Sequence, residues 1–300
     1  MIEPLSRTKR FIYLGIFVIL FLVLIPVVVL YSTGYTISSD FTLEKTGGVY
    51  VYSTLPNVSI FINGKLERQT NSFQKGYFAS DLTPKQYTIK VQKDKYSDWN
   101  KTIIVLPQQV SEAYPFLIPN QVDMATITPK VLDSNGATTT NPVYTAIADL
   151  FNPLKVITTH ISTSTPATTS PEALAIPHQK VKVWKEKGSI FAEWTGDSSD
   201  TPFYFCSLPV LLKTGEQATS TCSTKILVYK TTNLETVDFY PGRNDVILFG
   251  TNDGIYVTEL DMRPNQNVVT LLSGKGLDFR VSDGEQVFIK SNKGYFQASL

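Results

Sequence analysis

The sequence has few of the residues that build metal and redox sites. It contains two cysteines and two histidines in 300 residues, which excludes a disulfide-dense scaffold. The histidines, His160 and His178, lie in or beside a polar linker without converging ligands. We therefore expect both to be solvated, and we predict no metal site and no cofactor.

The net charge is close to zero, and common catalytic motifs are absent as well. The 27 Lys and Arg against 26 Asp and Glu leave a net charge of +1, so no basic field points to a nucleic-acid partner. The motifs His-Glu-x-x-His, Gly-x-Ser-x-Gly, Walker A and Gly-x-Gly-x-x-Gly are all absent from the sequence. We expect a protein that is not an enzyme.

One long hydrophobic run is present, because residues 11–31 carry no charge. At ~1.5 Å per residue this run crosses the ~30 Å hydrocarbon core as one helix. Basic residues lie in the preceding tail, 1–10, whereas the next charged residue after the run is Asp40. This asymmetry predicts a protein of the cell membrane whose N-terminus is cytoplasmic and whose remaining domains are extracytoplasmic. A cleavable signal peptide is the alternative, but its apolar core is shorter, roughly 7 to 15 residues, and ends in a small-x-small site.

After a juxtamembrane segment, 32–46, the pattern changes to that of β-strands. Apolar residues alternate with a period of two through residues 47–119, as in strands with one buried face. Asn63-Gly64 follows one such run and predicts a two-residue hairpin turn. Residues 47–119 therefore predict a small antiparallel β-sandwich.

The order of these elements resembles the PEGA domain, a small β-domain of extracytoplasmic regions in bacterial and archaeal surface proteins. The likeness is carried by the turn and strand Leu55–Lys65, the Leu-x-Pro strand Leu82–Val91 and the ending Lys95–Trp99. Asn57 and Lys95 stand where the family has glycine. The resemblance implies a β-sandwich fold outside the cytoplasm.

Residues 120–179 read as a linker. Asn141-Pro142 and the apolar stripe that follows predict a short capped helix near 142–151. The Ser/Thr/Pro-rich segment 158–171 has no formal charge and too little apolar surface to fold, which indicates an extended spacer.

Residues 180–300 contain a repeat of about 40 residues. Asp238-Phe239 recurs as Asp278-Phe279, and Gly254-Ile255-Tyr256-Val257 as Gly294-Tyr295-Phe296-Gln297. This period is typical of β-propeller blades, and the pattern resembles WD40-like repeats in architecture. Three units are fewer than the roughly four to eight of closed propellers. Either the region 125–154 supplies further strands or the propeller is partial.

Candidate binding residues lie in both β-regions. Tyr96 and Trp99 are candidates for an aromatic platform for sugar rings, but the favoured interpretation is that they pack the sandwich, since large aromatics dominate β-cores. Asp197 and Asp200 form an acidic loop whose oxygens are candidates for Ca²⁺, but the EF-hand spacing is absent, which favours a solvated turn.

The only cysteines, Cys206 and Cys222, are both in the external region. A pair outside the cytoplasm is expected to oxidise, so we predict a disulfide, with two free buried thiols as the alternative.

The sequence therefore predicts a mainly β, single-pass membrane protein with a non-catalytic role as an envelope or cell-surface binding or scaffold module. Its expected partners are the lipid bilayer, through residues 11–31, and a cell-wall glycan or an envelope protein. The alternative is a cell-envelope hydrolase or hydrolase accessory with a site in the C-terminal loops around Asp197 and Asp200.

Overall fold

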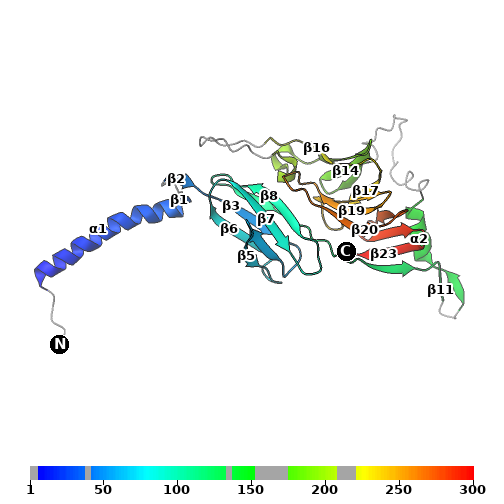
Figure 1. Cartoon of the computed structure of the whole chain (residues 1–300), viewed down its shortest axis with the longest axis horizontal. Helices are drawn as coiled ribbons and strands as arrows, with labels where there is room; N and C mark the ends of the chain where they lie inside the picture. The colour runs from blue at the N-terminus through cyan, green and yellow to red at the C-terminus, as the bar shows by residue number, and fades with distance from the viewer. Residues whose placement is uncertain (1–5, 38–41, 133–136, 153–174, 208–220) are drawn as a thin grey trace.

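The computed structural model describes residues 6–37, 42–132, 137–152, 175–207 and 221–300. Within these ranges the chain is mainly β, with several antiparallel sheets and one long helix at its N-terminal end (Figure 1). The predicted spacer 158–171 and His160 lie outside the described residues.

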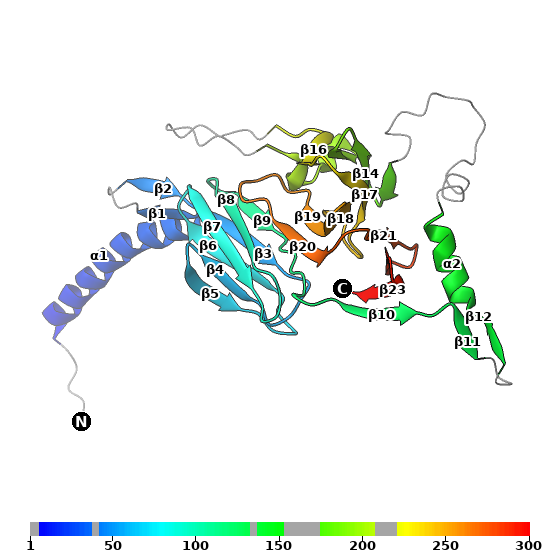
Figure 2. The same cartoon turned by 45° about the vertical axis from the view of Figure 1, so that its right-hand side comes forward.

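The apolar run forms helix α1 (Arg7–Ser32), which projects away from the β-domains (Figures 1 and 2). None of its residues is buried. Its 26 residues extend about 39 Å, and the helix is long and apolar enough to cross a membrane.

A short joint connects α1 to the first β-domain. The hairpin β1 (Tyr35–Ile37) and β2 (Leu43–Lys45) follows the helix. Beyond it, the backbone N–H and the hydroxyl of Thr46 both donate to the carbonyl of Gly34, at 2.7 and 2.9 Å. Gly34 has a φ of +78°, a conformation that glycine adopts without steric penalty. The helix therefore leads into the domain through a defined turn.

Two sheets that share one core follow, and we call them together the sandwich. The first sheet has the order β6-β3-β9 and the second β5-β4-β7-β8. The strands are β3 (Gly47–Tyr52), β4 (Ser59–Ile62), β5 (Lys65–Gln69), β6 (Gly76–Leu82), β7 (Gln86–Gln92), β8 (Trp99–Ile104) and β9 (Val110–Ala113). The alternating residues predicted to face inward are buried, among them Val49, Ile60 and Ile89. Strand β9 pairs with β3 in parallel, so the prediction of a wholly antiparallel sandwich is wrong at this edge.

The turn predicted at Asn63-Gly64 is confirmed. Both residues have positive φ, 50° and 80°, as a type I′ turn requires. The side-chain oxygen of Asn63 also accepts the N–H of Thr88 at 2.9 Å, which joins the turn to β7.

The remaining chain forms three four-stranded antiparallel sheets, which we call the three-sheet domain (Figure 2). The first contains β13 (Ile176–His178), β14 (Val181–Glu186), β15 (Ser189–Trp194) and β16 (Lys225–Lys230). The second contains β17 (Leu234–Phe239), β18 (Val246–Thr251), β19 (Gly254–Glu259) and β20 (Val268–Ser273). The third contains β21 (Asp278–Val281), β22 (Val287–Ser291), β23 (Gly294–Ser299) and β10 (Asp123–Ile127). The described residues form no closed ring of sheets.

The region predicted as linker contributes structure to this domain. Strand β10 pairs antiparallel with β23 and completes the third sheet. A small hairpin, β11 (Lys130–Leu132) and β12 (Thr138–Thr140), precedes helix α2 (Pro142–Leu150). The side chain of Asn141 caps α2 by accepting the N–H of Val143 at 3.0 Å, as predicted. The helix packs on the third sheet through Ile147, which clusters with Phe288.

His178 is not the solvated residue that we expected. It is half-buried on β13, with its ring 5.2 Å from the ring of Phe239. Strand β13 of the first sheet packs here against β17 of the second sheet. The sequence alone does not reveal this contact.

The repeated Asp-Phe pairs have the same local structure in β17 and β21. Asp238 and Asp278 each accept the N–H of the following phenylalanine, at 2.7 and 2.9 Å. The two strands are also joined directly, because the hydroxyl of Thr236 donates to Asp278 at 2.8 Å. Phe239 and Phe279 are both buried. Both carboxylates therefore lie where β17 packs against β21, each next to a buried phenylalanine.

Asp238 makes the stability of the fold depend on pH. Burial raises its pKa from 3.8 to about 6, so its contribution is full below about pH 4 and declines as the pH rises through 6. Asp238→Asn should abolish this decline, and the variant should gain up to about 3 kcal/mol relative to the wild type between pH 4 and pH 7. Urea unfolding of the full chain in detergent micelles would measure the difference, and a difference independent of pH would contradict the prediction.

Candidate functional site

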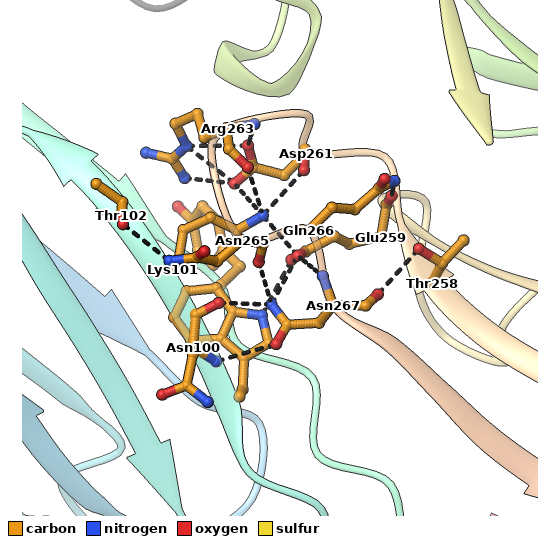
Figure 3. A network of polar contacts seen from close by, with 12 residues as sticks. Asn100, Lys101, Thr102, Thr258, Glu259, Asp261, Arg263, Asn265, Gln266 and Asn267 are labelled. Carbon is orange, nitrogen blue, oxygen red and sulfur yellow. Dashed lines mark hydrogen bonds and ion pairs between the residues drawn. The ribbon is translucent and has the colours of Figure 1, made fainter.

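The sandwich and the three-sheet domain are joined by a buried polar network (Figure 3). Lys101 on β8 has a fully buried side chain, at 0% exposure, and its Nζ lies 2.6 Å from Glu259 Oε1, whose side chain is 4% exposed. The same ammonium group donates to the carbonyl of Asp261 at 2.9 Å. Trp99 donates its indole N–H to Glu259 Oε2 at 3.0 Å. The network therefore connects Trp99 and Lys101, which share one face of β8, to the end of β19 and the loop that follows it.

The two carboxylates of the network have opposite pKa shifts. Burial raises the pKa of Glu259, and Lys101 offsets only part of that effect. Burial also acts to raise the pKa of Asp261, but its hydrogen bonds and ion pair with Arg263, together with Lys101, lower it below the ordinary value. Asp261 is therefore held as a carboxylate, while Glu259 depends on Lys101 for its charge.

Asn267 closes the junction along the edge of β8. Its side chain accepts the N–H of Asn100 at 3.0 Å and donates to the carbonyl of Asn100 at 2.8 Å. The N–H of Thr102 donates to the carbonyl of Pro264 at 3.1 Å. Apolar residues of both domains belong to one continuous core cluster. The domains therefore have a fixed relative orientation.

This arrangement argues against the weaker candidate, a sugar platform at Tyr96 and Trp99. Trp99 is only 1% exposed and has its N–H bonded to Glu259, so neither face of its ring is free. Tyr96 is half-buried against the core, with the ammonium of Lys93 5.6 Å from its ring centre. Both aromatics pack the sandwich, as the favoured interpretation predicted.

A cleft of about 580 Å³ lies where the two domains meet. It is formed by the ends of β3 and β9, the loop between β17 and β18, and two short 3-10 turns, Ser198–Asp200 and Phe203–Phe205. Its lining residues are Tyr52, Thr54, Glu112, Tyr114, Asp200, Thr201, Pro202, Phe203, Tyr204, Arg243, Asn244 and Asp245.

Arg243 holds the floor of the cleft to the sandwich. Its guanidinium pairs with Asp245 at 2.7 Å and donates to the backbone carbonyls of Tyr114 and Pro115, at 2.9 and 3.4 Å. Burial acts to lower the pKa of Arg243, but the hydrogen bonds and charge of Asp245 raise it. The guanidinium is thus permanently charged, and its hydrogen bonds lie within the protein.

Aromatic rings and carboxylates form the wall of the cleft. The ring of Tyr114 lies 6.5 Å from that of Tyr52 and stacks at 5.8 Å on that of Phe203. The hydroxyl of Tyr114 donates to Glu112 at 3.1 Å, and burial together with this carboxylate raises the pKa of Tyr114 to about 12. The cleft therefore presents ring faces beside hydrogen-bond acceptors at neutral pH.

Of the acidic residues predicted from sequence, Asp200 lines this cleft and Asp197 does not. Asp197 caps a short turn by accepting the N–H and the hydroxyl of Ser199, at 2.9 and 3.0 Å. These hydrogen bonds lower its pKa. Among the described residues no group of His, Cys, Asp and Glu side chains is arranged to hold a metal ion.

Sequence reasoning did not find Tyr52, Tyr114, Phe203 or Arg243. A signal for one of them was present, because Tyr50 and Tyr52 alternate with the buried Val49 and Val51. Alternation places those tyrosines on the outer face of the strand.

Cys206 and Cys222 form a disulfide in the structure. They face each other as an antiparallel pair and close the segment between them, next to the 3-10 turn that lines the cleft.

A scan against protein-family models found no matching family, and a search of curated proteins found no matching sequence.

The Lys101 network yields a stability prediction. Lys101→Met leaves the buried Glu259 carboxylate without its ion-pair partner, so we expect a loss of about 3 to 5 kcal/mol in the free energy of unfolding. Lys101→Met combined with Glu259→Gln should recover much of that loss, because the amide keeps the bond to Trp99. Lys65→Met is the control, since Lys65 and Glu67 are 78% and 25% exposed and the expected loss is below about 1 kcal/mol. Equal losses for Lys101→Met and Lys65→Met would contradict the prediction.

The disulfide between Cys206 and Cys222 yields a second prediction, on alkylation and stability. Intact protein treated with a thiol alkylator should gain no mass without reductant and two adducts after reduction and unfolding. The double variant Cys206→Ser and Cys222→Ser should lose about 3 kcal/mol, because the unfolded chain regains the freedom of the closed loop. Two adducts on the unreduced, unfolded chain would refute the bond.

Proposed function

We propose that the protein is a single-pass, membrane-anchored binding module whose β-domains lie outside the cytoplasm and which carries out no catalysis. The observation that supports this most is the cleft at the junction of two rigidly joined domains. A preformed concave site with ring faces and a few placed polar groups is the usual form of a ligand site. Its partner is a cell-wall glycan or an envelope protein.

The membrane topology is part of this proposal. The basic residues Arg7, Lys9 and Arg10 precede the apolar helix, which favours a cytoplasmic N-terminus. A disulfide between Cys206 and Cys222 is compatible with an oxidising compartment for the β-domains.

We also propose the two architectural likenesses. Asn57 and Lys95, which stand at glycine positions of the PEGA pattern, both have positive φ, 56° and 64°, and this supports a PEGA-like sandwich. The three sheets follow chain order except for β10, and β17 packs against both β14 and β21. That arrangement supports blade-like units of a partial propeller.

A hydrolase is the second candidate, because the carboxylates of Glu112 and Asp200 line the same cleft. It predicts activity on envelope polymers that Asp200→Ala abolishes while the thermal unfolding temperature is unchanged. Activity that persists in Asp200→Ala would remove this candidate.

The topology can be tested by labelling single cysteines in a background without Cys206 and Cys222. Asp283→Cys, in an exposed turn, should react with a membrane-impermeant maleimide in intact cells. Ser6→Cys, before the helix, should react only after permeabilisation. The reverse pattern would place the β-domains in the cytoplasm and overturn the proposal.

Binding can be tested with a photo-crosslinking residue in the full chain. Placed at Thr54, which lines the cleft, it should give a crosslinked product with purified envelope glycan or with one defined envelope protein. Placed at the exposed Lys65 on β5, it should give none. Products of equal yield from both positions, or from neither, would count against a binding role for the cleft.

A further inference from the structure

The outer face of sheet β6-β3-β9 carries aromatic side chains that the core does not use. Val49 and Val51 of β3 are buried, so Tyr50 and Tyr52 lie on the opposite face. The backbone register pairs Tyr50 with Phe78 of β6 on one side and with Glu112 of β9 on the other. Phe78 is 52% exposed, whereas residues on the solvent-facing side of a strand are usually polar.

Two glycines allow these rings to lie close to the sheet. A Cβ atom on Gly48 would approach Phe78 Cε2 to 2.6 Å, and one on Gly76 would approach the hydroxyl oxygen of Tyr50 to 2.6 Å. Neither glycine has a positive φ, so backbone conformation does not explain them. The missing side chains leave space that the two rings occupy, which keeps the face flat.

The aromatic residues continue from this face into the cleft. Tyr52 follows Tyr50 on the same face and lines the cleft together with Tyr114 and Phe203. The ring centres of Tyr52 and Tyr114 are 6.5 Å apart, and those of Tyr114 and Phe203 are 5.8 Å apart. The ring of Phe203 is covered by Tyr114 and by the guanidinium of Arg263, which lies 4.5 Å from the ring centre, so it supports the strip from below rather than offering a face. We call the other four residues the aromatic strip; its members are Phe78, Tyr50, Tyr52 and Tyr114.

The polar groups beside the aromatic strip limit which chemical class of ligand can bind there. Glu112 and Asp200 are exposed carboxylates on the cleft wall, so they accept hydrogen bonds and repel anions. Arg243, the cation of the lining, already pairs with Asp245 and two backbone carbonyls. A ligand here needs many donors, no negative charge and flat apolar faces. The hydroxyl groups and C–H faces of sugar rings meet these three requirements, whereas a peptide backbone also presents carbonyls that need donors.

We infer that the aromatic strip and the cleft bind an extended, uncharged oligosaccharide, with successive sugar rings stacked from Phe78 to Tyr114 and hydroxyls bonded to Glu112 and Asp200. This inference rests on the proposed binding function and names its ligand class. Stacking on several rings in a row makes affinity depend on the length of the saccharide.

The test uses the full chain in lipid nanodiscs and calorimetric titration with cellohexaose, N-acetylchitohexaose and maltohexaose and their disaccharides. At least one hexasaccharide should bind, at least about tenfold more tightly than its disaccharide. Tyr52→Ala and Phe78→Ala should each weaken hexasaccharide binding by about tenfold. Phe78→Ala should leave disaccharide binding unchanged if the short ligand occupies the cleft.

Two further variants separate binding from folding. Phe73→Ala removes an exposed aromatic from the loop between β5 and β6, outside the aromatic strip, and should leave affinity unchanged. Gly48→Ala displaces the ring of Phe78 without removing it and should weaken hexasaccharide binding as Phe78→Ala does. All variants should keep the wild-type unfolding temperature within a few degrees.

Three results would overturn the inference. They are no binding to any hexasaccharide, equal loss in Phe73→Ala and Phe78→Ala, and equal affinity for hexasaccharide and disaccharide. Suppose that no saccharide binds, but that a proline-rich peptide binds to the wild type and not to Tyr52→Ala. This result would also overturn the inference, but it would leave the proposed binding function intact. Failure of the crosslinking test at Thr54 as well would remove both.

Discussion

The ion pair between Lys101 and Glu259 is the contact on which the arrangement of the two β-domains depends. Both side chains are removed from water, and a buried charge without its partner is strongly unfavourable. Separating the sandwich from the three-sheet domain would leave each charge to be hydrated alone and would also break the bonds of Trp99 and Asn267. The two domains are consequently one rigid body, and the cleft between them exists before any ligand arrives.

The contacts of β3 link this junction to the N-terminal end of the sandwich. Strand β3 begins directly after the turn in which Thr46 bonds to Gly34, and the same strand ends at Tyr52 in the cleft. Strand β3 therefore connects the Thr46 contact with the cleft, and the hairpin of β1 and β2 lies between helix α1 and this strand. This continuity suits the proposed role of a module that presents a surface beyond a membrane anchor.

Prediction from the sequence succeeded where the signal is local. The apolar run, the alternation in the sandwich, the Asn63-Gly64 turn and the Asn141 cap each depend on residues a few positions apart, and the structure contains all four. Prediction failed where the partner is distant. The sandwich was expected to be wholly antiparallel, but β9 returns to β3 in parallel. His178 was expected in solvent, but it packs against Phe239 of another sheet.

The sequence by itself therefore determined the class of the protein: an apolar helix followed by β-domains, and no motif for metal or cofactor chemistry. The tertiary structure alone decided where a ligand has room. Tyr52, Tyr114, Phe203 and Arg243 come from separate strands and turns, and their side chains meet only because the buried network aligns the two domains. Periodicity records which face of a strand is apolar, but it does not record which distant strand lies opposite, since that depends on packing and buried charge rather than on spacing.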